Sequence, residues 1–228
     1  GKGHQGAVYR IEEDKCVKIY PKADHANKEK QVLLKNQDLS FIPKVYETGD
    51  NYVVMEYLLG PDLNSYLKQQ SELSEEVTVE LLNILKAQKR AKFKTIDAPL
   101  RHVFITANGY KMVDHVYAFT RDQYRPLELF DNLHERNFLD AFLEQVKAID
   151  PELHKEWTKE PIPLGEEQKA MQNNNDKKEK KKKGKKKDKK KNNGKEDKKS
   201  SKKQGKNDKR HDQQTKKDKD NKKKKEKK

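Results

Sequence analysis

Short apolar runs in the first 57 residues predict a small β-sheet. Four of them have the length and spacing of strands, at 7–12, 15–20, 42–46 and 51–57. The last two flank Thr48-Gly49-Asp50, which is typical of a hairpin turn, and the final run is apolar enough to be a central strand. Residues 26–34 have apolar positions at helical spacing. This part of the chain therefore predicts an antiparallel sheet with one helix.

After Gly60-Pro61 the pattern changes to longer amphipathic stretches, which predict helices at 62–69, 74–92, 126–149 and 150–157. Ser74, which two glutamates follow, is a suitable N-cap for the second of these helices. Gly60 and Pro61 mark a hinge between two lobes. We expect an α+β fold with a sheet lobe at residues 1–57 and a reduced helical lobe at residues 58–165.

A second hairpin is predicted inside the helical lobe. Its strands are the apolar runs 103–105 and 110–113, and Asn108-Gly109 supplies the turn. The second strand leads directly into Asp114. A carboxylate at the end of an apolar strand is costly to bury unless it meets a cation, so Asp114 is a candidate site residue.

Charge divides the chain into two parts. Residues 171–228 hold 29 of the 53 Lys and Arg residues but only 10 of the 38 Asp and Glu residues, so they carry a net charge of +19 and the first 170 residues one of −4. From Asn173 onward no aliphatic or aromatic residue occurs, and such a segment cannot bury enough surface to offset its chain entropy. We expect residues 166–228 to form a disordered lysine-rich tail.

Cysteine content and hydropathy limit the class of protein. The single cysteine, Cys16, excludes an internal disulfide, and no stretch approaches the roughly 20 apolar residues of a membrane span. We therefore expect a cytoplasmic protein without a transmembrane segment. No histidine lies at a recognisable partner position for Cys16, which favours a pocket-lining residue over a nucleophile.

The glycines at the start of the chain form its most informative motif. Gly1, Gly3 and Gly6 are spaced so that backbone N–H groups can approach a polyphosphate without an intervening Cβ. Lys18, on the next predicted strand, can neutralise phosphate charge. Glycines alone are more often a plain tight turn. The lysine that follows favours nucleotide binding.

These residues resemble the protein-kinase family. The glycine-loop pattern of the family is matched at every fixed position, by Gly1, Gly3, Gly6 and Val8. Cys16-Val17-Lys18 is similar to the strand-three lysine motif, which implies that Cys16 lines the adenine and that Lys18 holds the α- and β-phosphates. Glu29 then corresponds to the helix carboxylate that orients Lys18. Glu56 and Tyr57 resemble the hinge, whose backbone binds the adenine edge.

The second half resembles the family more loosely. Asp114 with His115-Val116 stands where the family has its metal-binding Asp-Phe-Gly motif. Asp97 then occupies the place of the catalytic aspartate and His102 that of the metal-binding asparagine. The resemblance implies that Asp97 aligns the acceptor hydroxyl and that Asp114 and His102 bind metal. Plainer interpretations are a turn carboxylate for Asp97, and local packing for His102 and His115.

The resemblance covers about residues 1–120, and several positions depart from it. Thr95-Ile96 replaces the usual His-Arg, Pro99 stands where a catalytic-loop lysine is expected, and no Ala-Pro-Glu motif follows. The resemblance implies a small, atypical bacterial-type serine/threonine protein kinase. Such a protein binds ATP with Mg²⁺ or Mn²⁺ and transfers the γ-phosphate to a protein hydroxyl. The departures leave a pseudokinase, which binds nucleotide or acts as a scaffold, as the alternative.

The lysine-rich tail has two interpretations. A charge run is most often a solvated segment without a partner. The other interpretation is an electrostatic anchor for nucleic acid or anionic lipid. Because the tail has no aromatic residue for base stacking, we expect any nucleic-acid contact to be weak, sequence-blind and sensitive to salt.

Overall fold

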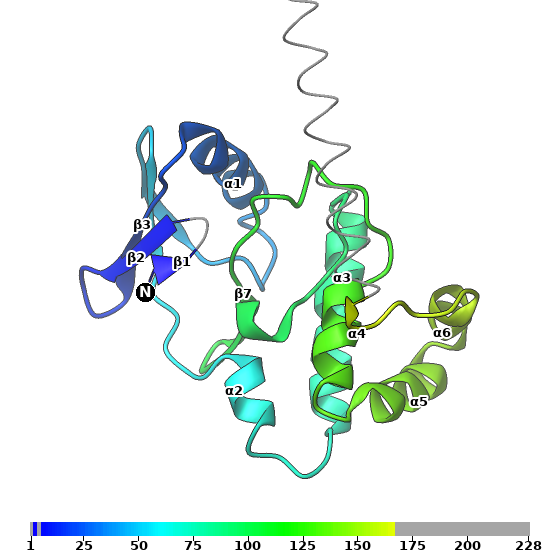
Figure 1. Ribbon diagram of the computed structural model, residues 1–228. Helices are drawn as coiled ribbons and strands as arrows, with labels where there is room; N and C mark the ends of the chain where they lie inside the picture. Colours follow the sequence, from blue (N-terminus) through cyan, green and yellow to red (C-terminus); the bar gives the residue numbers. More distant parts are fainter. Residues whose placement is uncertain (1, 4–5, 167–228) are drawn as a thin grey trace, which may run out of the picture. The chain divides into compact units, whose positions relative to one another are not determined.

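The computed structural model describes residues 2–3 and 6–166, and Figure 1 shows the arrangement of their elements. Gly1 and residues 167–228, which make up almost all of the predicted tail, lie outside the described residues. In the described part no helix is long and apolar enough to cross a lipid bilayer. The domain boundaries, the cytoplasmic location and the contacts of the tail stay predictions.

The first part of the chain forms a five-stranded antiparallel sheet in the order β1-β2-β3-β5-β4. Its strands are β1 (Lys2–Gly3), β2 (Gly6–Arg10), β3 (Lys15–Ile19), β4 (Val45–Thr48) and β5 (Tyr52–Glu56). Every second side chain of the central strands is buried, as the geometry of a strand requires. Cys16 and Lys18 of β3 face inward, and Val53 and Met55 of β5 lie in the core. Four of the five strands overlap the predicted apolar runs, β4 only in part, and β1 was not predicted.

One helix, α1 (Ala23–Lys35), contacts β4 and β5. Its buried stripe consists of Ala26, Glu29, Val32 and Leu33 at helical spacing. A carboxylate in the middle of an apolar stripe requires a buried partner, because burying an unpaired charge is costly. The helix starts three residues before the predicted stretch.

The connection between the two parts of the fold is fixed by close backbone contact. Gly60 has a φ of 138°, and a Cβ atom there would lie 1.9 Å from the carbonyl oxygen of Ile105. Next to it, the Ile105 N–H donates to the carbonyl of Pro61 at 3.0 Å. Only glycine permits both this φ and this approach. The expected hinge is therefore tied to the hairpin of the helical lobe.

Replacing Gly60 with alanine should unfold the protein at lower denaturant concentration, with a loss of about 2 kcal/mol or more in the free energy of unfolding. Gly109→Ala is the matched control. Gly109 also has a positive φ, of 94°, but its added Cβ would meet nothing within 4 Å. Urea denaturation would compare the two variants. Equal losses would mean that backbone strain alone, and not the contact with Ile105, fixes the connection.

Two capped helices and a hairpin open the helical lobe. They are α2 (Leu63–Leu67), α3 (Glu75–Arg90), β6 (Val103–Thr106) and β7 (Gly109–Met112), with a short 3-10 turn, η1 (Leu100–His102), before β6. The Ser74 hydroxyl accepts from the N–H of Val77, so the predicted N-cap is present. The Asp62 carboxylate accepts from the N–H of Ser65 and caps α2 in the same way. The hairpin ends two residues before Asp114, close to where the sequence predicts it.

The stretch predicted as one helix at 126–149 is two helices, so that prediction was wrong in one respect. The first, α4 (Leu127–His134), ends where Asn137 adopts a φ of 61°, and α5 (Leu139–Ile149) begins directly after it. Asparagine tolerates the left-handed conformation that ends a helix. The N–H groups of Asn137 and Phe138 bond back to the last carbonyls of α4. The apolar spacing continues through the break, which is why the pattern did not reveal it.

The last helix, α6 (Pro151–Thr158), closes the helical core. Its Trp157 is 2% exposed; it meets Phe130 of α4 edge to face at 5.4 Å and stacks on Phe142 of α5 at 6.2 Å. Such pairs add to the burial energy of the rings themselves. These three rings pack together and anchor α6 on α4 and α5.

Candidate functional site

The centre of the site is Lys18 on β3. Its Nζ atom lies 2.7 Å from Oε2 of Glu29 on α1 and 3.2 Å from Oδ1 of Asp114, which follows β7. The Glu29 side chain is 1% exposed and that of Lys18 is 9% exposed. Burial lowers the pKa of Lys18, but the two carboxylates outweigh it and hold this pKa above its ordinary value. Lys18 is therefore a charged ammonium held between two anions.

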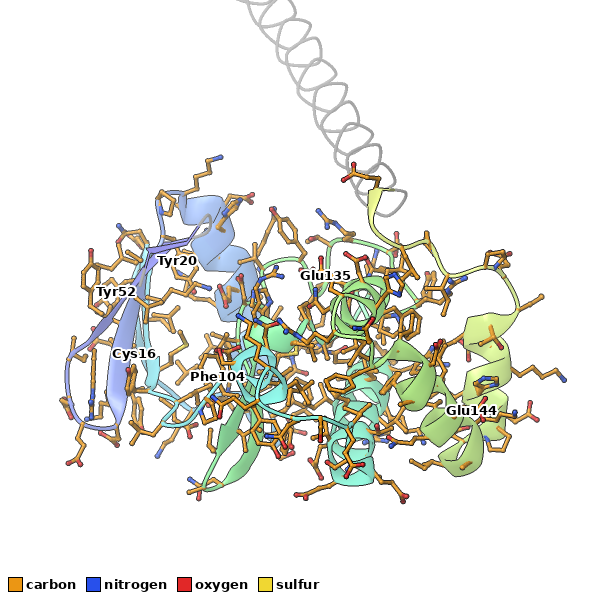
Figure 2. All side chains as sticks on the ribbon, turned by 60° about the horizontal axis from the view of Figure 1, so that its bottom comes forward. Cys16, Tyr20, Tyr52, Phe104, Glu135 and Glu144 are labelled. Carbon is orange, nitrogen blue, oxygen red and sulfur yellow. The ribbon has the colours of Figure 1, made fainter. Side chains whose placement is uncertain are left out.

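Glu29 links the helix to the loop after β7. Its second oxygen, Oε1, accepts the backbone N–H of His115 at 3.2 Å, while Oε2 accepts Lys18. Tyr20 lies on the inner side of the sheet beside α1 (Figure 2), and Nζ of Lys18 lies 5.2 Å from the centre of its ring. Burial, with Glu29 close by, raises the pKa of the Tyr20 hydroxyl. The partner that a buried Glu29 requires is thus Lys18.

Asp114 stands beside His102. Its backbone has a φ of 70°, in the left-handed region that few residues other than glycine adopt. Oδ2 of Asp114 lies 3.6 Å from Nε2 of His102, and the N–H of Val113 donates to the carbonyl of His102 at 2.9 Å. Burial lowers the pKa of His102, so the imidazole is neutral near pH 7. We refer to Lys18, Glu29, His102 and Asp114 as the Lys18 cluster.

His115 packs in the core and takes no part in the cluster through its side chain. Its ring packs against the rings of Phe41 and Phe93, and Nε2 is 2.8 Å from the carbonyl of Met112. Burial lowers its pKa and keeps it neutral. Among the described residues no group of three or more His, Cys, Asp and Glu side chains is arranged to hold a metal ion. Two protein donors, His102 and Asp114, are what the cluster offers.

Asp97 lies outside the Lys18 cluster, and its carboxylate is occupied. Oδ1 accepts the N–H groups of Ala98 at 2.9 Å and of Leu129 at 3.0 Å. Oδ2 accepts the N–H of Glu128 at 2.9 Å and the side-chain amide of Gln123 at 2.6 Å. The residue is 6% exposed. Burial raises its pKa to about 7, although the three backbone N–H donors favour the charged form.

These contacts make Asp97 a cap for α4. The residue before that helix is Pro126, which provides no side-chain cap, and Glu128 and Leu129 belong to its first turn. A carboxylate satisfies such unpaired N–H groups and complements the positive end of the helix dipole. The backbone of Asp97 is held in turn by the side-chain amide of Gln88, through bonds of 2.8 and 3.0 Å. No local signal in the sequence indicated this role, because the capped helix begins 30 residues later.

Glu56, in the predicted adenine-binding hinge, forms an ion pair that was not predicted from the sequence. Oε2 of Glu56 lies 3.0 Å from Nζ of Lys111 on β7 and also accepts the backbone N–H of Lys44. Tyr57 donates its N–H to the carbonyl of Asp14 at 2.8 Å. The pair joins the sheet to the β6-β7 hairpin. The sequence gives no sign of this ion pair, because 55 residues separate Glu56 from Lys111.

The predicted glycine loop lies at the edge of the sheet. Gly3 pairs with Gly6 in the β1-β2 ladder, and a Cβ on Gly6 would lie 2.4 Å from the carbonyl of Ile19. Val8 is half-buried and pairs with Lys18 across the ladder, while Cys16 is buried beside it. Burial raises the pKa of the Cys16 thiol, which does not favour a nucleophile. In the described part of the loop, Gly6 and Val8 thus lie on the strand that pairs with the Lys18 strand.

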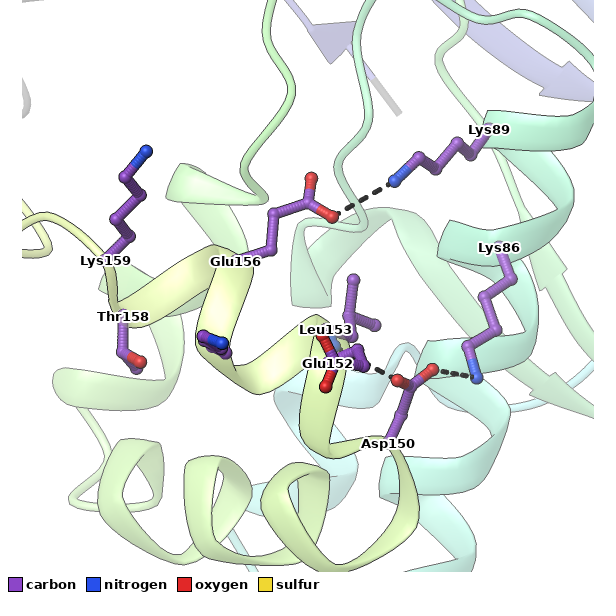
Figure 3. Close-up of a pocket in the computed structure, with 9 residues that line it drawn as sticks. Lys86, Lys89, Asp150, Glu152, Leu153, Glu156, Thr158 and Lys159 are labelled. Atoms are coloured by element: carbon purple, nitrogen blue, oxygen red, sulfur yellow. Dashed lines mark hydrogen bonds and ion pairs between the residues drawn. The ribbon is translucent and has the colours of Figure 1, made fainter.

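A separate pocket lies between α3 and α6 (Figure 3). Lys86 pairs with Asp150 at 2.7 Å, and Lys89 pairs with Glu156 at 3.2 Å. None of the predicted site residues lines it. These pairs join α3 to the segment that carries α6, so we interpret the pocket as part of the docking of that helix.

With this geometry in place, known proteins can be compared. No protein-family model matches the chain. Over 124 residues it is 27% identical to "Putative serine/threonine-protein kinase YrzF" of Bacillus subtilis (strain 168), and the match covers 52% of this chain and 58% of that protein. The chain is similar to protein kinases. The expected resemblance to protein kinases is confirmed at this level, and the chain matches little more than half the length of this relative.

Among solved structures, the kinase-like chain is similar to the PknI kinase domain of Mycobacterium tuberculosis, which was crystallised as a point mutant. The TM-score is 0.40 with 16% sequence identity, over 53% of this chain and 58% of that one. The predicted α+β class, with an antiparallel sheet followed by a helical lobe, is the fold described above.

Proposed function

We propose that the chain is a kinase-like protein that binds ATP with a divalent cation at the Lys18 cluster and transfers the γ-phosphate to a serine or threonine hydroxyl of a protein. The observation that carries this proposal is the Lys18 ammonium, held 2.7 Å from Glu29 and 3.2 Å from Asp114. A buried lysine held in this way is oriented to meet a further anion. Phosphoryl transfer depends on such positioning and charge neutralisation.

The nucleotide would lie along the sheet. Lys18, oriented by Glu29, would hold the α- and β-phosphates, and the backbone of the glycine loop would cover them. Val8 and Cys16 would contact the adenine, whose edge would meet the backbone at Glu56 and Tyr57. These roles follow the kinase resemblance residue by residue.

Asp114 and His102 would hold the cation. Lys18 supplies one positive charge, and Glu29 and Asp114 supply one negative charge each, so the cluster has a net charge of −1. A bound cation would neutralise this charge. The carboxylate oxygen of Asp114 fits either Mg²⁺ or Mn²⁺, whereas the neutral imidazole nitrogen of His102 is a better ligand for Mn²⁺ than for Mg²⁺. The other ligands would come from phosphates and water. When bound, the cation supplies neutralisation of phosphate charge.

Transfer would also require Asp97 to align the acceptor hydroxyl. In the described conformation its carboxylate accepts four hydrogen bonds, three of them from residues 123–129. That segment must therefore withdraw from Asp97 before an acceptor can reach it. We propose this withdrawal as a step that precedes transfer.

The occupied carboxylate of Asp97 favours a second candidate, a pseudokinase that binds nucleotide without turnover. A carboxylate that caps a helix is already accounted for by its structural role. Assaying transfer from γ-labelled ATP, with Mg²⁺ and separately with Mn²⁺, distinguishes the two. Transfer that Asp97→Asn abolishes supports the kinase, whereas nucleotide binding without transfer supports the pseudokinase.

Asp114→Asn is the sharpest test of the nucleotide site itself. Asparagine tolerates the positive φ at this position, so the fold should persist. Removing the charged oxygen should weaken cation-dependent ATP binding by roughly tenfold or more and abolish any transfer. Isothermal titration with ATP and cation would measure this. The control is Asp38→Asn at an exposed position. Unchanged ATP binding in Asp114→Asn would remove the cluster from the nucleotide site.

A further inference from the structure

The donors His102 and Asp114 are placed by one hairpin. His102 ends the turn before β6 and Asp114 follows β7, so the two ends of the hairpin bring them together. The bond from the Val113 N–H to the His102 carbonyl fixes this register at 2.9 Å. The relative position of the two side chains therefore belongs to the fold of the hairpin and does not require a nucleotide.

The orientation of Asp114 leaves one oxygen for His102. Lys18 engages Oδ1, and Oδ2 lies 3.6 Å from Nε2 of His102. That separation is too long for a hydrogen bond. Two adjacent ligands that each lie about 2.1 Å from an octahedral ion are about 3.0 Å apart, so a small movement of the two side chains toward each other would let both bind one cation. Both side chains are about one-fifth exposed, at 20% and 19%.

The chemistry of this pair differs for different cations. Mg²⁺ prefers an octahedron of oxygen ligands, whereas imidazole nitrogen is a ligand of first-row transition cations. We infer that His102, paired with Asp114, makes this site select a transition cation, with Mn²⁺ as its probe, over Mg²⁺ as the partner of the bound nucleotide. The inference rests on the proposed function, because it concerns the cation of the same site.

The test compares the cation preference of two proteins. For the full chain and for His102→Asn, the affinity for a non-hydrolysable ATP analogue is measured in Mn²⁺ and in Mg²⁺, and the ratio of the two affinities is taken. The nucleotide's own cation preference contributes equally to both ratios, so it cancels when the ratio for the full chain is compared with the ratio for His102→Asn. We expect the ratio to fall by roughly tenfold in His102→Asn, because the amide oxygen suits Mg²⁺. His134→Asn, at an exposed position of α4, should leave it unchanged.

A spectroscopic measurement identifies the ligand directly. Pulsed electron paramagnetic resonance of Mn²⁺ bound with the analogue should detect coupling to a histidine nitrogen in the full chain and in His134→Asn. The coupling should disappear in His102→Asn while Mn²⁺ stays bound. An absent nitrogen signal in the full chain, or an unchanged affinity ratio in His102→Asn, overturns the inference. Failure to bind the analogue with either cation would instead overturn the proposed function, so the two failures are distinguishable.

Discussion

Replacing Lys18 with methionine should abolish ATP binding and lower the free energy of unfolding by about 3 kcal/mol. Methionine has a similar length but no charge, so Glu29, at 1% exposure, would lose its buried cation. Removing one partner of a buried pair costs more than the pair contributes, because the other charge stays uncompensated. Chemical denaturation and ATP titration would measure the two losses separately.

Two further variants separate the two roles of Lys18. Lys15→Met on the same strand removes an exposed pair with Glu12 and should cost far less stability than Lys18→Met, because exposed pairs contribute little. Lys18→Met combined with Glu29→Gln removes both buried charges and should recover much of the stability without recovering ATP binding. If the double variant binds ATP as the full chain does, Lys18 is a structural ion-pair residue and not a phosphate ligand.

Asp97→Asn should lower the free energy of unfolding by about 3 kcal/mol, which corresponds to roughly 6–12 °C in the melting temperature. An amide offers one acceptor oxygen, and its NH₂ group would face donors of α4 or of Gln123. The first turn of α4 would lose half of its cap. Thermal unfolding followed by circular dichroism would measure the loss.

Asp62→Asn is the matched control for this variant. Asp62 also accepts a backbone N–H at a helix start, but asparagine is as good an N-cap there, so little stability should be lost. ATP binding should survive in Asp97→Asn, because Asp97 does not contact the Lys18 cluster. A variant as stable as the full chain would show that the capping bonds contribute little, and Asp97 would then be available for catalysis.

The sequence predicted the elements of the fold well where the signal is local. The short apolar run at 15–20 predicted β3, and Ser74 marked the start of α3. The break between α4 and α5 escaped because a single asparagine, Asn137, causes it inside a continuous apolar pattern. Local patterns describe the inner faces of helices and strands, but they carry little information on a single residue with unusual backbone.

The candidate site was predictable to a different degree at each residue. The resemblance placed Lys18, Glu29 and Asp114 in one group, and the structure brings these three together. It could not reveal the partners of Asp97, since Gln123, Glu128 and Leu129 come from a segment without a motif. Contacts between distant segments depend on how the helices pack, and no spacing in the sequence encodes them.

The two oxygens of Glu29 have a mechanical consequence. One holds the ammonium of Lys18 and the other holds the backbone N–H of His115, so a single side chain of α1 serves two different segments. A rotation of α1 would break both bonds in the same movement. If only one of the two bonds broke, one oxygen of the buried Glu29 carboxylate would be left without a hydrogen-bond partner, which is costly. With both bonds formed, α1 therefore keeps the Lys18 ammonium and the loop after β7 in register.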